Sequence, residues 1–245
     1  MGLIRTTLRK AFGKISPFPS YCEYAFFIKR KKALARNGNA MNFSFSQEGE
    51  DLMLETMFYK FFGKTNDGFF VDLGAYNPLK YSNTMKFYVK GWRGVNIDAR
   101  PGSMKEFNRL RPEDINVEAA ISPDGKQAVY YEFSEPTANT FDSRAAEESL
   151  KLGLTMTGKH VLDTYTVNEL FEKYIPEGQK IDLLDIDVEG FDSMIVQQLD
   201  WDKYHPSIVM IETSVDSDNI IPEIMEKNGY VLRGRTYFND IYILR

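Results

Sequence analysis

Acidic residues stand at the ends of several short apolar stretches in this 245-residue sequence. The clearest cases are Asp72, Asp98 and Glu212, together with residues 185–189, which read Asp-Ile-Asp-Val-Glu. Burying a carboxylate costs several kcal/mol unless the group is paired or hydrogen-bonded. Ligands of open α/β sheets bind beyond the carboxyl ends of the strands. We therefore expect these residues to face a ligand, a cation or water on one rim of a sheet.

The turn after Asp72 is the first candidate for binding a nucleoside. A dinucleotide fold would have three glycines here, spaced so that a pyrophosphate sits on a helix N-terminus. Gly74 stands alone, and Pro78 lies where the other glycines would fall. S-adenosylmethionine suits this turn better, because it has no phosphate, needs close backbone approach at one glycine and carries cationic groups. Asp98 either accepts hydrogen bonds from the ribose hydroxyls or is a turn residue at a strand end.

A sheet must position these residues, and the pattern of apolar residues predicts one. Apolar runs at 68–73, 94–98, 115–121, 181–188 and 208–212 are typical of buried parallel strands. Helical patterns lie between them, and two begin with capping boxes, Ser103 with Glu106 and Thr166 with Glu169. The predicted helices cover about 46–62, 82–90, 103 onward, 166–174, 190–199 and 220–228.

The last third of the pattern sets the type of sheet. Extra strands are predicted at 127–133 and around Val161, with an irregular stretch at 134–158, and the chain ends in a hairpin of 230–235 and 237–244. A hairpin forces its last strand to run antiparallel to its neighbour. We therefore predict an α/β fold with a Rossmann-like sheet of the methyltransferase type, which is mostly parallel with an antiparallel last strand and has helices on both faces.

Composition favours one catalytic domain and is compatible with a reducing compartment. The chain is 43% hydrophobic and long enough to bury one good core. Cys22 is the single cysteine, so no internal disulfide framework is expected. No stretch approaches the roughly 18 to 20 consecutive apolar residues of a membrane span, and the N-terminus lacks the pattern of a secretory signal. We expect a cytoplasmic protein.

The N-terminal residues differ in charge from the rest of the chain. The first forty residues hold nine lysines and arginines against one acidic residue, Glu23, although the whole chain carries a net charge of -5. We predict a basic amphipathic arm and linker at 1–42 and a catalytic domain at 43–245. The arm could contact an anionic membrane surface peripherally, or be a leader or a helix packed on the domain. No nucleic-acid partner is expected, because the domain is acidic.

Four blocks, in order, resemble the signature blocks of FkbM-family methyltransferases. They are Phe45–Asp51, Val71–Ala75, Ile97 with Asp98, and Asp185–Phe191. The resemblance covers about residues 43–212. It implies a class I methyltransferase fold, S-adenosylmethionine as the methyl donor, and usually an oxygen acceptor on a sugar or a natural product.

The resemblance also implies roles for individual residues. The turn of Asp72, Gly74 and Ala75 matches the methionine-binding turn, Asp98 the ribose carboxylate, where a glutamate is usual, and residues 120–122 the segment beside adenine. Asp187 and Glu189 match the acidic pair beside the methyl group. The cofactor-binding candidates are Gln47, Asp51, Asp72, Gly74, Ala75, Asn83, Asp98, Ala99, Ala120, Ile121, Ser122 and Asp187.

The implied reaction is an in-line attack of a hydroxyl oxygen on the methyl carbon. A hydroxyl is a poor nucleophile, so a base within hydrogen-bond reach should help. The candidate catalytic residues are Asp187, then Glu189, then Glu212; no metal ligand is assigned, although these three could also hold a divalent cation. Glu189 could instead cap the following helix. His205 precedes a strand, at the wrong end of the sheet, and His160 is a weaker candidate than the carboxylates.

The expected acceptor is a hydroxyl of a sugar in a glycan or glycolipid. Thr137, Asn139, Thr140 and Asp142 lie in the long irregular stretch, where short polar side chains could bind sugar hydroxyls. A small natural product or a nitrogen acceptor would be served by the same cofactor blocks. The chain could also be an inactive cofactor-binding module or an NAD-dependent oxidoreductase. Asp187 and Glu189 argue against the inactive module, and the missing glycines argue against the oxidoreductase.

Overall fold

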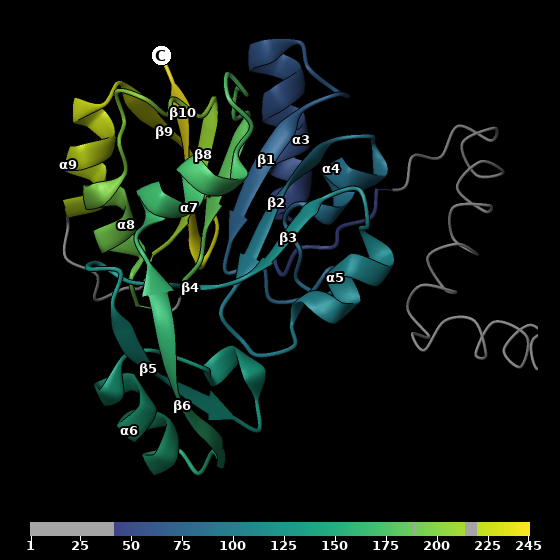
Figure 1. Ribbon diagram of the computed structural model, residues 1–245. Helices are drawn as coiled ribbons and strands as arrows, with labels where there is room; N and C mark the ends of the chain where they lie inside the picture. Colours follow the sequence, from purple (N-terminus) through teal and green to yellow (C-terminus); the bar gives the residue numbers. More distant parts are fainter. Residues whose placement is uncertain (1–41, 189, 214–219) are drawn as a thin grey trace, which may run out of the picture. The chain divides into compact units, whose positions relative to one another are not determined.

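A seven-stranded sheet forms the centre of the computed structural model, which describes residues 42–188, 190–213 and 220–245 (Figure 1). The strand order is β3-β2-β1-β7-β8-β10-β9. The first five strands in this order pair in parallel, whereas β10 runs antiparallel to both neighbours, β8 and β9. The strands are β1 (Phe69–Leu73), β2 (Arg93–Asp98), β3 (Ile115–Glu118), β7 (Leu183–Ile186), β8 (Ile208–Glu212), β9 (Tyr230–Arg235) and β10 (Asn239–Leu244). The predicted α/β fold with an antiparallel last strand is confirmed.

Helices cover both faces of this sheet (Figure 1). The helices are α3 (Glu50–Phe62), α4 (Met85–Val89), α5 (Met104–Leu110), α7 (Val167–Tyr174), α8 (Asp192–Gln198) and α9 (Ile220–Lys227). Alternate residues of β1 divide between two cores. Phe69, Val71 and Leu73 pack with α7, α8 and α9, and Phe70 packs with α3 and α4. By the period of two along a strand, Asp72 faces the side of α3 and α4.

A second, smaller sheet forms a lobe beyond the carboxyl ends of the main strands (Figure 1). Its strand order is β4-β6-β5, with β4 (Ala120–Ile121) parallel and β5 (Gln127–Phe133) antiparallel to β6 (Met156–Tyr165). A short 3-10 helix, η1 (Pro136–Ala138), and a helix, α6 (Ser143–Lys151), connect β5 to β6. This lobe places residues 120–165 above the rim that carries the acidic residues.

Several predicted elements differ from the structure. The stretch 115–121 is not one strand: it divides at Ala119, and β4 leaves the main sheet to pair with β6. Within the predicted irregular stretch, the sequence forms α6, which the Asp142 side chain caps by accepting from the Arg144 N–H at 2.7 Å. The Thr166 and Glu169 capping box is confirmed. The Ser103 box is wrong, because Ser103 already has helical φ and ψ and its side chain makes no cap hydrogen bond.

The predicted N-terminal arm and linker at 1–42 lies outside the described residues except for its last residue, and it stays a prediction. Residues from Ser44 to Arg245 form one compact unit, in which the site described below lies. None of the described helices has both the length and the hydropathy that a membrane-spanning helix needs.

Candidate functional site

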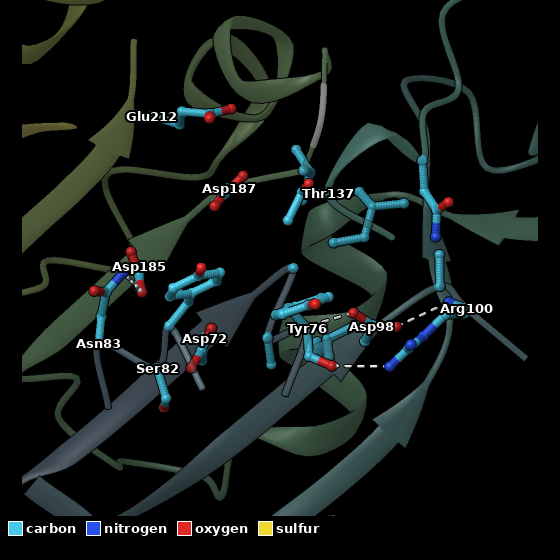
Figure 2. A pocket seen from close by; sticks show the side chains of 18 of the residues that line it. Asp72, Tyr76, Ser82, Asn83, Asp98, Arg100, Thr137, Asp185, Asp187 and Glu212 are labelled. Atoms are coloured by element: carbon cyan, nitrogen blue, oxygen red, sulfur yellow. Dashed lines mark hydrogen bonds between the residues drawn. The ribbon is translucent and has the colours of Figure 1, made fainter. Parts of the chain in front are cut away.

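The carboxyl ends of β1, β2, β7 and β8 border a cavity of about 450 Å³. Residues of the β1–α4 turn, the segment before α3, the β9–β10 turn and the lobe complete its lining. This volume lies within the range of pockets that hold small ligands and cofactors. Figure 2 shows polar side chains gathered around it, among them Asp72, Asp98, Asp185, Asp187 and Glu212. The structure thus brings the acidic strand ends together on one rim.

Gly74 allows the turn after β1 to approach the end of β7 closely. Its φ of 87° lies in the left-handed region, and a Cβ at this position would come within 1.6 Å of the Asp187 carbonyl oxygen. The approach is fixed by the Asp187 N–H, which donates to the Leu73 carbonyl at 2.9 Å, and by the N–H groups of Gly74 and Ala75, which both donate to the Ile97 carbonyl. Only glycine fits here, and Gly74 and Ala75 both line the cavity.

Asp98, at the end of β2, is held in place through both of its carboxylate oxygens. One accepts from the Tyr76 N–H and the other from the Arg100 N–H, each at 2.9 Å. The Arg100 side chain then donates to the Tyr76 carbonyl at 3.0 Å, which closes the ring of contacts seen in Figure 2. Burial raises the pKa of Asp98, and these donors oppose the shift. Asp98, Ala99 and Arg100 line the cavity.

Asp72 connects the cavity to a buried ion pair. Its carboxylate accepts from the Thr84 hydroxyl at 2.6 Å, and Thr84 in turn accepts from the Arg111 guanidinium at 3.1 Å. Arg111 pairs with Asp114 at 2.8 Å, and both side chains are fully buried. Burial raises the pKa of Asp72 to about 6, while the Thr84 hydroxyl and the Arg111 charge act in the opposite direction.

Asp185 lies next to Asp72 in the sheet, because the two residues are register partners on β7 and β1. Its side chain accepts from the Asn83 amide at 3.0 Å and is only 3% exposed. Burial raises the pKa of Asp185 well above its ordinary value, and the neighbouring Asp72 carboxylate adds to this. Both Asp185 and the predicted Asn83 line the cavity. Sequence reasoning recognised Asp185 as a strand end but gave it no role.

Asp187 directly follows β7, Glu212 is the last residue of the neighbouring strand β8, and both line the cavity. Burial raises the pKa of Glu212 to about 7, the nearby Asp192 carboxylate raises it further, and a hydrogen bond with Asp187 lowers it. Glu189 lies outside the described residues, so its predicted role stays a prediction. Asp192 accepts from the N–H groups of Val188 and Gly190, at 2.9 and 3.3 Å, and so holds the turn before α8.

The block before and within α3 joins the cavity wall to the final hairpin. Gln47 lines the cavity, as does Glu50, which accepts from Asn239 at 3.1 Å and Thr236 at 3.2 Å. Asp51 does not line it: its side chain is fully buried and accepts from the Phe45 N–H at 2.8 Å. The structure therefore places Gln47 at the site and Asp51 in support of the loop that carries it.

The segment expected beside adenine is only partly at the cavity. Ile121 lines it, together with Ala119, which the sequence did not single out. Ala120 and Ser122 do not: Ala120 pairs with Thr164 of β6, and the Ser122 hydroxyl is hydrogen-bonded to the Thr164 hydroxyl. The change of sheet at Ala119 explains this, because Ser122 turns toward the lobe.

The lobe contributes a wall that mixes aromatic and polar groups. Its lining residues are Tyr130, Glu135, Thr137, Asn139 and Phe141. Thr137 and Asn139 were predicted acceptor contacts; Thr140 and Asp142 do not line the cavity, and Asp142 caps α6. Tyr130 packs on Phe141, whose ring lies 5.5 Å from that of Phe191 beside the β7–α8 turn. Sequence reasoning missed the aromatic residues, because an isolated aromatic residue in a sequence does not indicate whether it lines a cavity.

Two further turn residues that line the cavity have unusual backbones. Tyr76 and Tyr81 have φ values of 48° and 59°, and their rings stack at 6.3 Å. Neither histidine lines the cavity; His160 contacts Glu132 at 3.2 Å on the lobe. In the described ranges, no group of three or more histidine, cysteine or acidic side chains has an arrangement that could hold a metal ion.

Comparisons with known proteins identify the family of this chain. Two similar solved structures are a TehB-like SAM-dependent methyltransferase from Corynebacterium glutamicum (11% identity, TM-score 0.42, 93% of this chain and 100% of that chain) and a precorrin-6y C5,15-methyltransferase from Geobacter metallireducens (10% identity, TM-score 0.41, 84% and 92%). No curated protein matches the chain. The family model of the methyltransferase FkbM domain matches residues 72–232, from the Asp72 turn through β8 and into β9. Because this match spans more than half of the sequence, the chain belongs to the FkbM family of methyltransferases.

Proposed function

We propose that this methyltransferase uses S-adenosylmethionine to methylate a hydroxyl group of a sugar in a glycan or glycolipid. Family membership supports the cofactor, and the cavity supports the choice of a hydroxyl acceptor. The observation that carries the proposal is the pair of carboxyl groups, Asp187 and Glu212, at the ends of adjacent strands beside the Gly74 turn.

The residues at the β1 and β2 ends of the cavity fit S-adenosylmethionine. The Gly74 turn offers backbone with no side chain in the way, and Asp98 offers a carboxylate whose oxygens are already fixed by two N–H donors. Asp98, Ala99 and Ile121 would contact the nucleoside, and Gly74 and Ala75 the methionine part. When bound, the cofactor supplies an electrophilic methyl group on a sulfonium.

Glu212 has the properties of a base for a hydroxyl acceptor. A general base works best when its pKa is close to the working pH, and burial raises the pKa of Glu212 to about 7. Asp187 lines the cavity beside Glu212 and lowers the pKa of Glu212, opposing the effect of burial. An alcohol gains more from such a base than an amine, which is nucleophilic once neutral. In this proposal Glu212 receives the hydroxyl proton and Asp187 orients Glu212 and the acceptor oxygen.

The wall formed by the lobe supports a carbohydrate rather than a purely apolar acceptor. Thr137, Asn139 and Glu135 provide hydroxyl, amide and carboxylate groups that can hydrogen-bond sugar hydroxyls. Phe141 and Tyr130 provide ring surface against which the C–H face of a sugar can pack. The mixture of both kinds of group within one wall is what a sugar ring requires.

The test measures methyl transfer by the full-length protein. Labelled S-adenosylmethionine would be offered with oligosaccharides, glycolipids and amine acceptors, and the methylated product located by NMR. Glu212→Gln should lower kcat about 10²- to 10⁴-fold while leaving the affinity for S-adenosylhomocysteine unchanged. Glu132→Gln, a lobe residue paired with His160 away from the cavity, is the matched control. Methylation of nitrogen, or full activity of Glu212→Gln, would contradict the proposal.

A further inference from the structure

Asp185 has an oxygen that nothing in the described part of the protein satisfies. Its Oδ2 accepts from the Asn83 amide, whereas its Oδ1 is buried without a hydrogen-bond partner among the described residues. A buried polar atom left unpaired costs about 1–3 kcal/mol, and more when the group is charged. Asp185 lines the cavity, so a bound ligand can come next to it.

The charges around Asp185 do not balance. Asp72 is its register partner on β1, and the Glu50 carboxylate also raises the pKa of Asp185. The fully buried cation on this face, Arg111, forms its ion pair with Asp114 and reaches Asp72 only through the Thr84 hydroxyl. Among the described residues, no lysine or arginine forms an ion pair with Asp185. In its ionised form, Asp185 therefore has no cationic partner among the described residues of this corner of the cavity.

The turn that carries Asn83 fixes both carboxylates from adjacent positions. Asn83 donates to Asp185 at 3.0 Å, and the next residue, Thr84, donates to Asp72 at 2.6 Å. The Ser82 hydroxyl accepts from the Met85 N–H at 3.0 Å and so anchors the start of α4. Two neutral donors thus hold two neighbouring carboxylates, an arrangement that orients the acids without supplying the cation. Figure 2 shows the contact between Asn83 and Asp185.

We infer that Asp185, oriented by Asn83 and backed by Asp72, is the subsite for a primary ammonium group, the α-ammonium of the methionine part of the donor. An ammonium offers three N–H donors and one positive charge, which are the two things that this corner lacks. The subsite adjoins the Gly74 turn that would hold the methionine part. This inference rests on the proposed use of S-adenosylmethionine and adds to it a residue outside the glycine turn and the ribose carboxylate.

The experiment pairs a change in the protein with a change in the ligand. Calorimetry would measure binding of S-adenosylhomocysteine, its des-amino analogue and 5′-methylthioadenosine to the full-length wild type and to Asp185→Asn. Asparagine keeps the shape and the contact with Asn83 but removes the charge. We expect Asp185→Asn to lower the affinity for S-adenosylhomocysteine about 10- to 100-fold. The affinities for the two ligands that lack the ammonium should change by less than about twofold, because the effect of the Asp185 charge depends on the presence of the ammonium.

Two controls separate this role from a general loss of structure. Asp182→Asn is the matched variant: it is also 3% exposed and lies just before β7, but it pairs with Lys64 at 2.7 Å and does not line the cavity. It should not distinguish among the three ligands. If Asp185→Asn does not fold, the wild type alone still decides, since it should bind the des-amino analogue at least 10-fold more weakly than S-adenosylhomocysteine.

The possible failures are distinguishable. The ammonium subsite is overturned if the wild type binds S-adenosylhomocysteine and its des-amino analogue with equal affinity. It is also overturned if Asp185→Asn lowers the affinity for all three ligands alike or for none of them. Either result leaves the proposed function standing. A wild type that binds none of the three ligands overturns the proposed cofactor and the subsite with it.

Discussion

Replacing Gly74 by alanine tests whether the close approach of two strand ends builds the cavity. A Cβ there would lie 1.6 Å from the Asp187 carbonyl oxygen, whereas ordinary contact begins at 3.4 Å, so the two backbones must separate by about 1.8 Å. That movement weakens the hydrogen bond from the Asp187 N–H to Leu73 and those from Gly74 and Ala75 to Ile97. Left-handed alanine costs about 1 kcal/mol, and the weakened bonds add about 0.5–1.5 kcal/mol each.

The expected total is a loss of about 3–5 kcal/mol in the free energy of unfolding, or about 6–20 °C in Tm. The matched control is Gly63→Ala, at the end of α3, where φ is 62° and a Cβ would meet nothing within 4 Å. It should lose only the conformational term, about 1 kcal/mol. Urea unfolding measures both variants, and calorimetry with S-adenosylhomocysteine should show binding lost only in Gly74→Ala. Equal destabilisation of the two variants would refute the reasoning.

Three further outcomes are expected. The rate of methyl transfer should rise with pH through about 7, because Glu212 must be ionised to accept a proton and burial raises its pKa to about 7. A pH profile of kcat checks this, and the rise near pH 7 should be absent from the profile of Glu212→Gln. The free energy of unfolding of the ligand-free protein should fall as pH rises from about 4 to 6. The reason is that burial raises the pKa of Asp72 to about 6 in the folded state, which therefore holds the proton more tightly than the unfolded chain does. Thermal melts across this range measure the loss, and its absence would show that the carboxyl is not buried. Arg111→Ala should cost about 3–5 kcal/mol by leaving Asp114 buried and unpaired, whereas Arg109→Ala, in a half-exposed pair with Glu106, should cost less than about 1 kcal/mol; urea unfolding of both variants measures the difference.

The main sheet could be predicted from the sequence because its strands are short apolar runs between amphipathic helices. The prediction was wrong at two places where the chain around an element, rather than its own apolar pattern, decides the structure. The strand expected at 115–121 divides because the chain at Ala119 changes partner from β2 to β6, and only the position of β6 reveals this. The sequence around Ser103 has the spacing of a capping box, but the turn before it already places Ser103 in the helical region.

The candidate site could be predicted as far as polar residues interrupt apolar strands. Asp72, Asp98, Asp187 and Glu212 were identified in this way, and all four line the cavity. The residues that complete the cavity come from tertiary packing. Phe141 reaches it because the lobe folds over the strand ends, and Tyr76 reaches it through a left-handed backbone that nothing in its sequence context specifies.

The buried carboxylates also explain why stability and function should oppose each other in this protein. A sheet selected for stability alone would have apolar residues at Asp72 and Asp185, as at Phe70 and Leu183 on the same face. Burial raises the pKa values of both acids, so ionising them in the ligand-free fold is unfavourable. A cationic ligand recovers that free energy when it binds, because it interacts with the charges only in the folded state. Asp185→Asn should therefore raise the Tm of the ligand-free protein while reducing the further rise that S-adenosylhomocysteine produces.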